Sequence, residues 1–309
     1  MTTDSPAPPP SPPEQAARLM RLATYASVSV ALTLIAAKFG AWLITDSVSI
    51  LSTLIDSLMD AAASIVNLLA VRHALAPADR EHRFGHGKAE PLAGLVQAAF
   101  ITGSALFLLI EAGQRLVYPR AIANSEIGYW VMGFSIVVTL GLVSFQKSVV
   151  RRTQSVAVGA DSLHYASDLL ANGSVVLALL LSSQLGFTLA DPLFALGIAG
   201  FILWGSWKIA QDSLNLLMDR ELPDDDRQRI RDIALRHPGV REVHDLKTRS
   251  SGQRIFIQLH IEMDRNLSLL RAHGISDAVM WDIERNFPNS EVIIHGDPEG
   301  VMERREIFH

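Results

Sequence analysis

Two five-residue segments decide how this chain folds: DSLMD at residues 56–60 and HYASD at residues 164–168. Each lies inside an apolar run long enough to cross a bilayer, which takes about 20 residues. In each segment the ionisable residues are four apart, so on a helix they project from one face, one turn from each other. A carboxylate at mid-bilayer costs roughly 2.5–3.5 kcal/mol even on lenient insertion scales. Three carboxylates and an imidazole there point to a buried cation.

If the two helices face each other, these segments offer one nitrogen and three oxygens, a full set for a tetrahedral divalent metal. The alternative is that the residues are protonated or meet water in an internal crevice. The chain has no cysteine, so a thiolate site is excluded and His and carboxylate ligands remain, which suit zinc, iron, manganese or cadmium better than copper(I). The predicted membrane site consists of Asp56, Asp60, His164 and Asp168.

Other charges in the apolar runs are expected to be structural or peripheral. Lys38 is placed near the outer end of its helix, where its long side chain can reach the interface. Asp161 is placed in the first turns of its helix, where a carboxylate favours the positive end of the helix dipole.

The hydropathy of the chain predicts a membrane domain followed by a soluble one. Of the 309 residues, 49% are hydrophobic and the mean hydropathy is +0.24, but the apolar residues are concentrated in the first two thirds. Six runs are long enough to be membrane helices. They cover residues 22–45, 48–71, 91–114, 127–146, 156–182 and 189–209.

Lys and Arg residues predict the orientation of these helices, because cytoplasmic connections are enriched in them. The connections after the second and fourth runs and the segments before the first and after the sixth are basic, whereas the opposite side has only Arg115 and Arg120. We therefore expect a multi-pass protein of the cell inner membrane with both termini in the cytoplasm.

Three segments of different character follow from the composition. Residues 1–16 are rich in proline and are expected to be a disordered tail. Residues 17–220 form the predicted transmembrane domain, and residues 221–309 a cytoplasmic domain. The order helix, strand, strand, helix, strand in this last segment predicts a small α+β (αββαβ) fold with helices on one face of a sheet.

The predicted soluble domain contains a cluster of histidines. In the strand at residues 254–263, isoleucine and leucine alternate with polar residues, so His260 should face away from the core. A single surface histidine is usually only solvated, but several histidines and an aspartate in so small a domain make a second metal site an equal alternative. Its candidate ligands are His244, His260, His273, His295 and Asp297.

A third group lies in the connection between the second and third apolar runs. Asp79, His82 and His86 have a spacing that permits chelation, and Gly85 and Gly87 let the backbone fold these side chains inward. A solvated loop explains the same composition equally well.

These residues together resemble the cation diffusion facilitator family. The resemblance is carried by the two four-residue pairs, by HRFGHGKAE at residues 82–90, by VIIHGDP at residues 292–298, and by six spans followed by a small cytoplasmic domain of metallochaperone-like fold. It extends from about residue 22 to residue 297. It implies a transport site at the membrane pairs, a loop site at Asp79, His82 and His86, and a binuclear site at the cytoplasmic ligands, at a dimer interface, where Asp297 bridges two ions.

We therefore expect a homodimeric secondary transporter, not an enzyme, that exports Zn²⁺ in exchange for protons by alternating access. The expected partners are the lipid bilayer, divalent metal ions and protons, with no nucleic acid, and Zn²⁺ is expected both as substrate and as a structural or regulatory ion. Fe²⁺, Cd²⁺ and Mn²⁺ are the alternative substrates. An intramembrane hydrolase with paired acidic residues and a passive channel are the alternatives from other classes.

Overall fold

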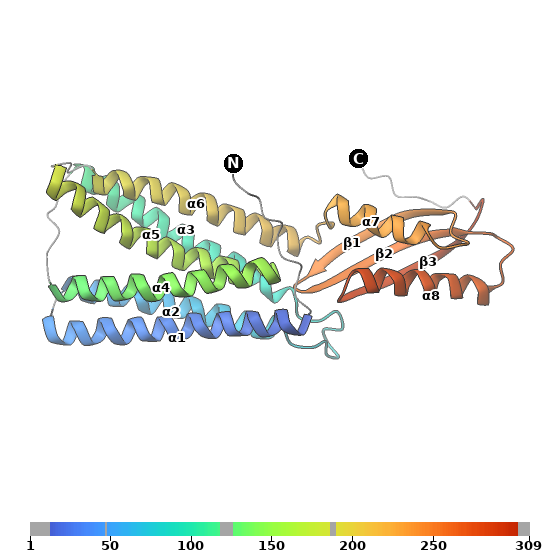
Figure 1. Ribbon diagram of the computed structural model, residues 1–309, viewed down its shortest axis with the longest axis horizontal. Coiled ribbons are helices and arrows are strands. Elements are labelled where there is room, and N and C mark those ends of the chain that lie inside the picture. Colours follow the sequence, from blue (N-terminus) through green and yellow to red (C-terminus); the bar gives the residue numbers. More distant parts are fainter. Residues whose placement is uncertain (1–12, 47, 118–125, 186–189, 302–309) are drawn as a thin grey trace. The chain divides into compact units, whose positions relative to one another are not determined.

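The computed structural model describes residues 13–46, 48–117, 126–185 and 190–301. It divides into two compact units, one ending at Leu214 and the other beginning at Asn215. The first unit consists of six long helices within the described residues, and the second of a three-stranded sheet with two helices (Figure 1).

The six helices of the first unit follow the six predicted runs. Their bounds are α1 Pro13–Thr45, α2 Val48–Ala74, α3 Ala89–Val117, α4 Glu126–Thr153, α5 Val156–Leu185 and α6 Ala190–Leu217. Five of them, all but α5, are long and apolar enough to cross a membrane by length and composition. The remaining helix, α5, is 30 residues long and carries Asp161, His164 and Asp168. The predicted helical membrane domain is thus confirmed.

Several helices run further than the apolar runs that predicted them. α1 begins nine residues before residue 22, and α4 and α6 continue past residues 146 and 209. Residues 13–16, expected to be disordered, form the first turn of α1; residues 1–12 of that predicted tail lie outside the described residues. Proline is favoured in the first turn of a helix because its missing N–H has no partner there, and Glu14 suits the helix dipole.

The packing of the first unit places α5 in contact with several other helices. α1 packs against α2 and α4, and α5 packs against α4 and α3 and also contacts α2 and α1 (Figure 1). α6 is joined to α3 by the Ser206 hydroxyl, which donates to the carbonyl of Ala98 at 2.7 Å. Gly205 lies where α6 meets α5, and a Cβ there would lie 2.8 Å from Leu163 Cδ2, so a larger residue would make the Leu163 side chain shift.

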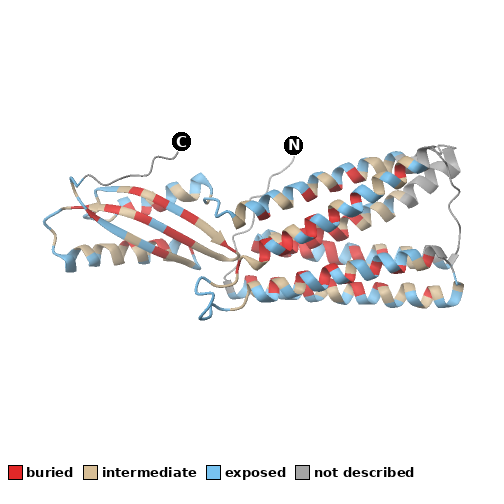
Figure 2. Ribbon diagram, turned by 180° about the vertical axis from the view of Figure 1, so that it is seen from behind, coloured by how far each residue is buried: buried red, intermediate tan, exposed pale blue. Residues whose placement is uncertain are grey.

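The outward faces of these helices are apolar. Trp130, Phe107 and Trp207 are among the large side chains left exposed, and buried residues are concentrated between the helices (Figure 2). A soluble protein rarely exposes so much contiguous apolar surface, whereas hydrocarbon tails cover such faces in a bilayer.

The second unit has the predicted order αββαβ. Its elements are α7 Asp224–Leu235, β1 Glu242–Ser251, β2 Arg254–Met263, α8 Leu269–Asn286 and β3 Ser290–Pro298. The sheet order is β1-β2-β3, with β1 antiparallel and β3 parallel to β2. Ile257, Leu259 and Ile261 of β2 are buried in one core with Ile230 of α7 and Ile283 of α8, so both helices cover the same face of the sheet. His260 alternates with these residues and lies on the other face.

Candidate metal sites

Three of the four predicted membrane ligands meet between α2 and α5. His164 Nε2 lies 3.0 Å from Asp60 Oδ1 and 3.8 Å from Asp168 Oδ2. One ligand atom from each of the three residues lies within 4.8 Å of the ligand atoms of the other two. The His164 side chain is 8% exposed, whereas those of Asp60 and Asp168 are 24% and 42% exposed. The imidazole thus lies on the inner side of the group and the carboxylates remain accessible to an arriving ion.

Asp56, the fourth predicted ligand, is not part of this group. It lies on α2 one turn before Asp60 and is exposed. The four-residue spacing places both carboxylates on one face of α2, but the approach of α5 determines which of them His164 reaches. The role of Asp56 as a metal ligand therefore stays a prediction.

Lys38 contacts α2 beside this group. Its Nζ donates to Ser57 Oγ at 2.6 Å and to the carbonyl oxygen of Thr53 at 3.1 Å. Ser57 lies between the two aspartates of the DSLMD segment, so the ammonium is held on the helical turn that carries them. This position corrects the expectation that Lys38 extends to the interface: two acceptors on α2 hold its charge within the helices.

Asp161, expected to be structural or peripheral, lies at the centre of a buried polar network. Ser27 Oγ lies 2.5 Å from its Oδ2, Gln146 Nε2 donates to the same oxygen at 2.7 Å, and Gln97 Nε2 donates to Oδ1 at 3.1 Å. These donors come from α1, α4 and α3. Asp161 is 1% exposed, so it joins α5 to three other helices instead of lying at the membrane surface.

Tyr165 adds a further connection from α5. Its hydroxyl is 2.9 Å from Ser64 Oγ of α2 and donates to the carbonyl of Ser27 at 3.3 Å. Tyr165 is the residue after His164, so the same turn of α5 both presents the ligand and is fastened to α1 and α2.

The loop between α2 and α3 brings together its three predicted ligands. Asp79 Oδ2 lies 3.2 Å from His86 Nε2, and Asp79 Oδ1 lies 3.4 Å from His82 Nδ1. The His86 side chain is 6% exposed, whereas those of His82 and Asp79 are 57% and 53% exposed. Gly85 has φ +83°, a conformation that glycine adopts without strain, and it turns the chain between the two histidines.

The carboxylate of Asp79 also shapes the loop. Its Oδ1 accepts from the backbone N–H groups of His82 at 2.6 Å and Glu81 at 2.9 Å. The hydrogen bond from His82 is the main cause that lowers the pKa of Asp79 below its usual value, since these N–H groups favour the charged form. Asp79 is therefore ionised, as a metal ligand must be.

The cytoplasmic unit places three histidines side by side across the sheet. His244 is paired with His260 across β1 and β2, and His260 with His295 across β2 and β3. All three contact one carboxylate: Asp297 Oδ2 lies 3.1 Å from His244 Nε2 and 2.9 Å from His260 Nδ1, and Asp297 Oδ1 lies 3.0 Å from His295 Nε2. Asp297 is 4% exposed. Two oxygens of one buried carboxylate, each beside an imidazole, are suited to bridging two ions.

The fifth predicted cytoplasmic ligand lies apart from this row. His273, on α8, is exposed and its Nε2 lies 3.5 Å from Asp277 Oδ2 of the same helix. Asp245, which the sequence did not single out, instead joins His244 and His260 as a possible ligand. It lies where the register of β1 shifts and has φ +46°. A β-bulge aims a side chain away from the regular alternation, so the spacing along the strand did not reveal it.

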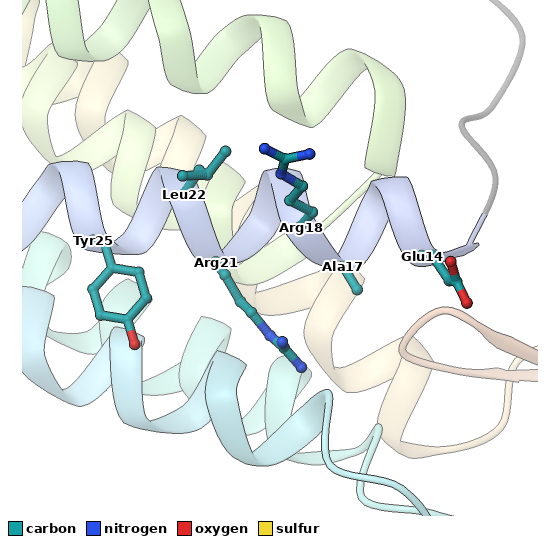
Figure 3. A pocket seen from close by; sticks show the side chains of 6 residues that line it. All are labelled: Glu14, Ala17, Arg18, Arg21, Leu22 and Tyr25. Atoms are coloured by element: carbon teal, nitrogen blue, oxygen red, sulfur yellow. The ribbon is translucent and has the colours of Figure 1, made fainter.

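A surface hollow of about 330 Å³ lies along α1 (Figure 3). It is lined by Glu14, Ala17, Arg18, Arg21, Leu22 and Tyr25. Only Glu14 among them has a carboxylate, so we assign no metal to it.

Comparison with known proteins identifies the family of both units. Residues 24–218 match the family described as the cation efflux transmembrane domain, and residues 222–299 match the cation efflux protein cytoplasmic domain. The chain belongs to the cation efflux family. It is therefore a membrane transporter of metal cations, and the resemblance to cation diffusion facilitators is confirmed.

Relatives within the cation efflux family are similar over nearly the whole chain. The cation-efflux pump FieF of Pectobacterium carotovorum is 51% identical over 286 residues, covering 93% of this chain and 95% of the relative. The pump of the same name from Klebsiella pneumoniae is 50% identical over 285 residues, covering 92% and 95%. Among solved structures, the metal-bound C-terminal domain of the CzcD transporter from Thermotoga maritima is 29% identical over 26% of this chain and 93% of that domain, with a TM-score of 0.25.

Proposed function

We propose that this protein is a proton-coupled divalent-cation antiporter that exports Zn²⁺ from the cytoplasm by alternating access. It acts as a homodimer in the inner membrane, with both termini in the cytoplasm. The observation that carries the proposal is the meeting of Asp60, His164 and Asp168 between two helices of the membrane unit. Such ionisable groups are costly among apolar helices and mark ion pathways.

Coupling to protons follows from the chemistry of these ligands. Carboxylate and imidazole bind a metal only when they are deprotonated, so a proton and a divalent cation compete for the same lone pairs. His164 is the main proton carrier in this proposal. An imidazole ordinarily titrates near pH 6.5, which lies between the pH values of the two compartments. Protons that arrive from outside displace the metal, and the loss of those protons to the cytoplasm restores the site.

Alternating access is assigned to movement of α2 and α5 relative to the other helices. Asp60 is already in contact with His164, whereas Asp56 lies one turn away on the same face of α2. A shift of α2 along α5 brings Asp56 to the ion and gives four protein ligands. A site closed by four protein ligands suits transport, because catalytic zinc sites keep a position open for water.

The donor set favours zinc among the possible substrates. One imidazole and carboxylate oxygens suit Zn²⁺ and Cd²⁺ better than Mn²⁺, which prefers oxygen ligands alone. Fe²⁺ accepts the same donors, so Fe²⁺, Cd²⁺ and Mn²⁺ are the competitors to be measured against zinc.

The cytoplasmic row of histidines is assigned a structural or regulatory role in the dimer. Asp297 supplies an oxygen to each side of the row, which supports a binuclear site with Zn²⁺ as resident ion. His273 is exposed and outside the row, so it can serve as a ligand only from a second copy of the chain. Zinc binding is then expected to strengthen the dimer.

The test is zinc flux in vesicles that contain the purified protein and carry a pH gradient. Asp60→Asn and His164→Ala are expected to reduce gradient-driven flux at least about 100-fold, since each removes a ligand of the transported ion. Asp212→Asn is the matched control, because it neutralises an exposed carboxylate on α6 outside the metal groups.

Three results would contradict the proposal. Wild-type rates in either ligand variant would show that the ion passes elsewhere. Zinc flux that ignores the pH gradient would indicate a passive channel. Cleavage of a peptide substrate by the purified protein, lost in Asp60→Asn, would favour an intramembrane hydrolase.

A further inference from the structure

A fourth imidazole lies beside the loop cluster formed by Asp79, His82 and His86. His73, in the last turn of α2, has its ring centroid 4.5 Å from that of His86, with the ring planes at 60°. The rings of His82 and His86 are 4.7 Å apart. His86 therefore lies between two other histidines, one from the loop and one from a membrane helix.

These ring separations match imidazoles that share one ion. With Zn–N bonds of about 2.0–2.1 Å and tetrahedral angles, two coordinated rings have centroids about 5 Å apart. In the cytoplasmic row the rings of His260 and His295 are 4.6 Å apart, and those of His244 and His260 are 5.3 Å apart. The His73–His86 pair has the same spacing as rings already assigned to metal groups.

A second, independent observation points to a ligand at this place. The His86 side chain is 6% exposed, and its Nδ1 has no hydrogen-bond partner among the described residues. Its other nitrogen faces Asp79 at 3.2 Å. A buried nitrogen with no partner is rare, because buried polar atoms are almost always satisfied by protein, water or an ion. Here it occurs within a cluster of two further imidazoles and a carboxylate.

We propose that His73 is a fourth ligand of the loop site and fastens a bound divalent cation to the C-terminal end of α2. The inference rests on the loop cluster binding a metal ion, as the resemblance to cation diffusion facilitators implies, but not on transport itself. His73 is exposed and lies at a helix end, so rotation about its side-chain bonds can bring a ring nitrogen to the ion. With it the site has three imidazoles and one carboxylate, a closed tetrahedral set.

Coordination by His73 links α2 to α3 through the bound ion. Asp79 and His82 belong to the loop, and His86 precedes the first residue of α3 by three positions. Without His73, no ligand of the loop ion comes from α2. With His73, the ion connects the end of α2 to the start of α3. His73 lies 13 residues after Asp60 on the same helix, about 20 Å at 1.5 Å per residue, so loop occupancy restrains the helix that carries the transport ligands.

The same geometry can also be explained without a metal ion. A histidine in the last turn of a helix stabilises the helix dipole when charged, and two imidazoles also pack against each other without metal. Under this explanation, replacing His73 alters the stability of the loop but not the coordination number of an ion bound there. Coordination number is therefore the quantity to measure.

The experiment uses the full-length chain in detergent with Asp60→Ala and His260→Ala, which remove one residue from the membrane group and one that both cytoplasmic groups share. Co²⁺ is the probe, because four-coordinate Co²⁺ absorbs visible light much more strongly than six-coordinate Co²⁺. We expect one strongly absorbing Co²⁺ per chain in this parent. His73→Gln should weaken binding at least about tenfold, the lower end of what even indirect partners of a metal contribute, and reduce the absorption as water replaces the ring.

Two further variants make the result decisive. In His73→Ala, added free imidazole should restore the strong absorption, which loss of a merely structural side chain would not allow. His237→Gln, a histidine paired with Asp282 in the cytoplasmic unit, is the matched control and should leave affinity and spectrum unchanged.

Each contrary outcome has a separate meaning. If His73→Gln keeps the parent's affinity and spectrum while His86→Gln abolishes binding, the loop site has three ligands and the inference is wrong. If the parent binds no Co²⁺, the loop site and the inference both fail. Neither result depends on zinc flux by the wild-type protein, so failure of the proposed transport function is recognised separately.

Discussion

Replacing Asp161 tests whether the buried network of α5 is structural. Asp161→Ala removes the shared acceptor of Ser27 Oγ, Gln146 Nε2 and Gln97 Nε2, which lie 2.5, 2.7 and 3.1 Å from the carboxylate. The Ser27 hydroxyl can still donate to the carbonyl of Ala23 at 3.0 Å, and Gln146 Nε2 can still donate to Ser27 Oγ at 2.9 Å, so Gln97 loses most. One unsatisfied buried polar group costs about 1–3 kcal/mol. Removing the carboxylate also removes the penalty for keeping it away from water, so we expect a loss of about 2 kcal/mol of unfolding free energy.

Asp161→Asn separates the network from the charge. The asparagine keeps the shape and one acceptor oxygen, and the amides of Gln97 and Gln146 can turn to present oxygen to its NH₂ group. We therefore expect a loss of about 1 kcal/mol or less, with transport largely retained. Unfolding free energy can be measured by denaturant titration in mixed micelles, and zinc flux in vesicles with a pH gradient.

Two controls accompany these variants. Asp212→Ala removes an exposed aspartate of α6. Ser135→Ala removes a buried hydroxyl of α4 that donates to the carbonyl of Val131 in its own helix. Both should change the unfolding free energy by well under the value for Asp161→Ala. The structural reading would be refuted if Asp161→Asn folded as stably as the wild type yet transported no zinc, since Asp161 would then act on the ion or the proton.

Two further predictions concern the cytoplasmic row and the charge beside the membrane site. Asp297→Ala removes the carboxylate shared by three imidazoles and should reduce the zinc affinity of the cytoplasmic site at least about tenfold, measured by calorimetry on the full chain. The control Asp232→Ala on α7 should leave this affinity unchanged. Equal zinc affinities in the two variants would show that Asp297 is not a ligand. Lys38→Gln removes a cation held on the turn between Asp56 and Asp60 and should tighten zinc binding at the membrane site up to about tenfold, because like charges repel even at an effective dielectric of about 20. Lys208→Gln on α6 is its control, and unchanged or weaker binding in Lys38→Gln would contradict this role.

The sequence by itself determined the helical and strand elements and the membrane character. Apolar runs of membrane length, and the alternation around His260 in β2, depend only on local periodicity, which the chain carries in full. The pairs of ligands within one helix were also determined in this way, because a four-residue spacing fixes a common face whatever the surroundings. The helix ends were less well determined, because a helix that leaves the membrane keeps its hydrogen bonds after its residues become polar.

Only the tertiary structure decided which of these residues meet. His164 reaches Asp60 and not Asp56 because of the position of α5 against α2, and no spacing within either helix records that position. The same holds for Lys38 on Ser57, for Asp161 between three other helices, and for His73 beside His86. These contacts join different elements, so they depend on how the elements pack. Packing is set by the side chains of the whole unit together and cannot be read from any one segment.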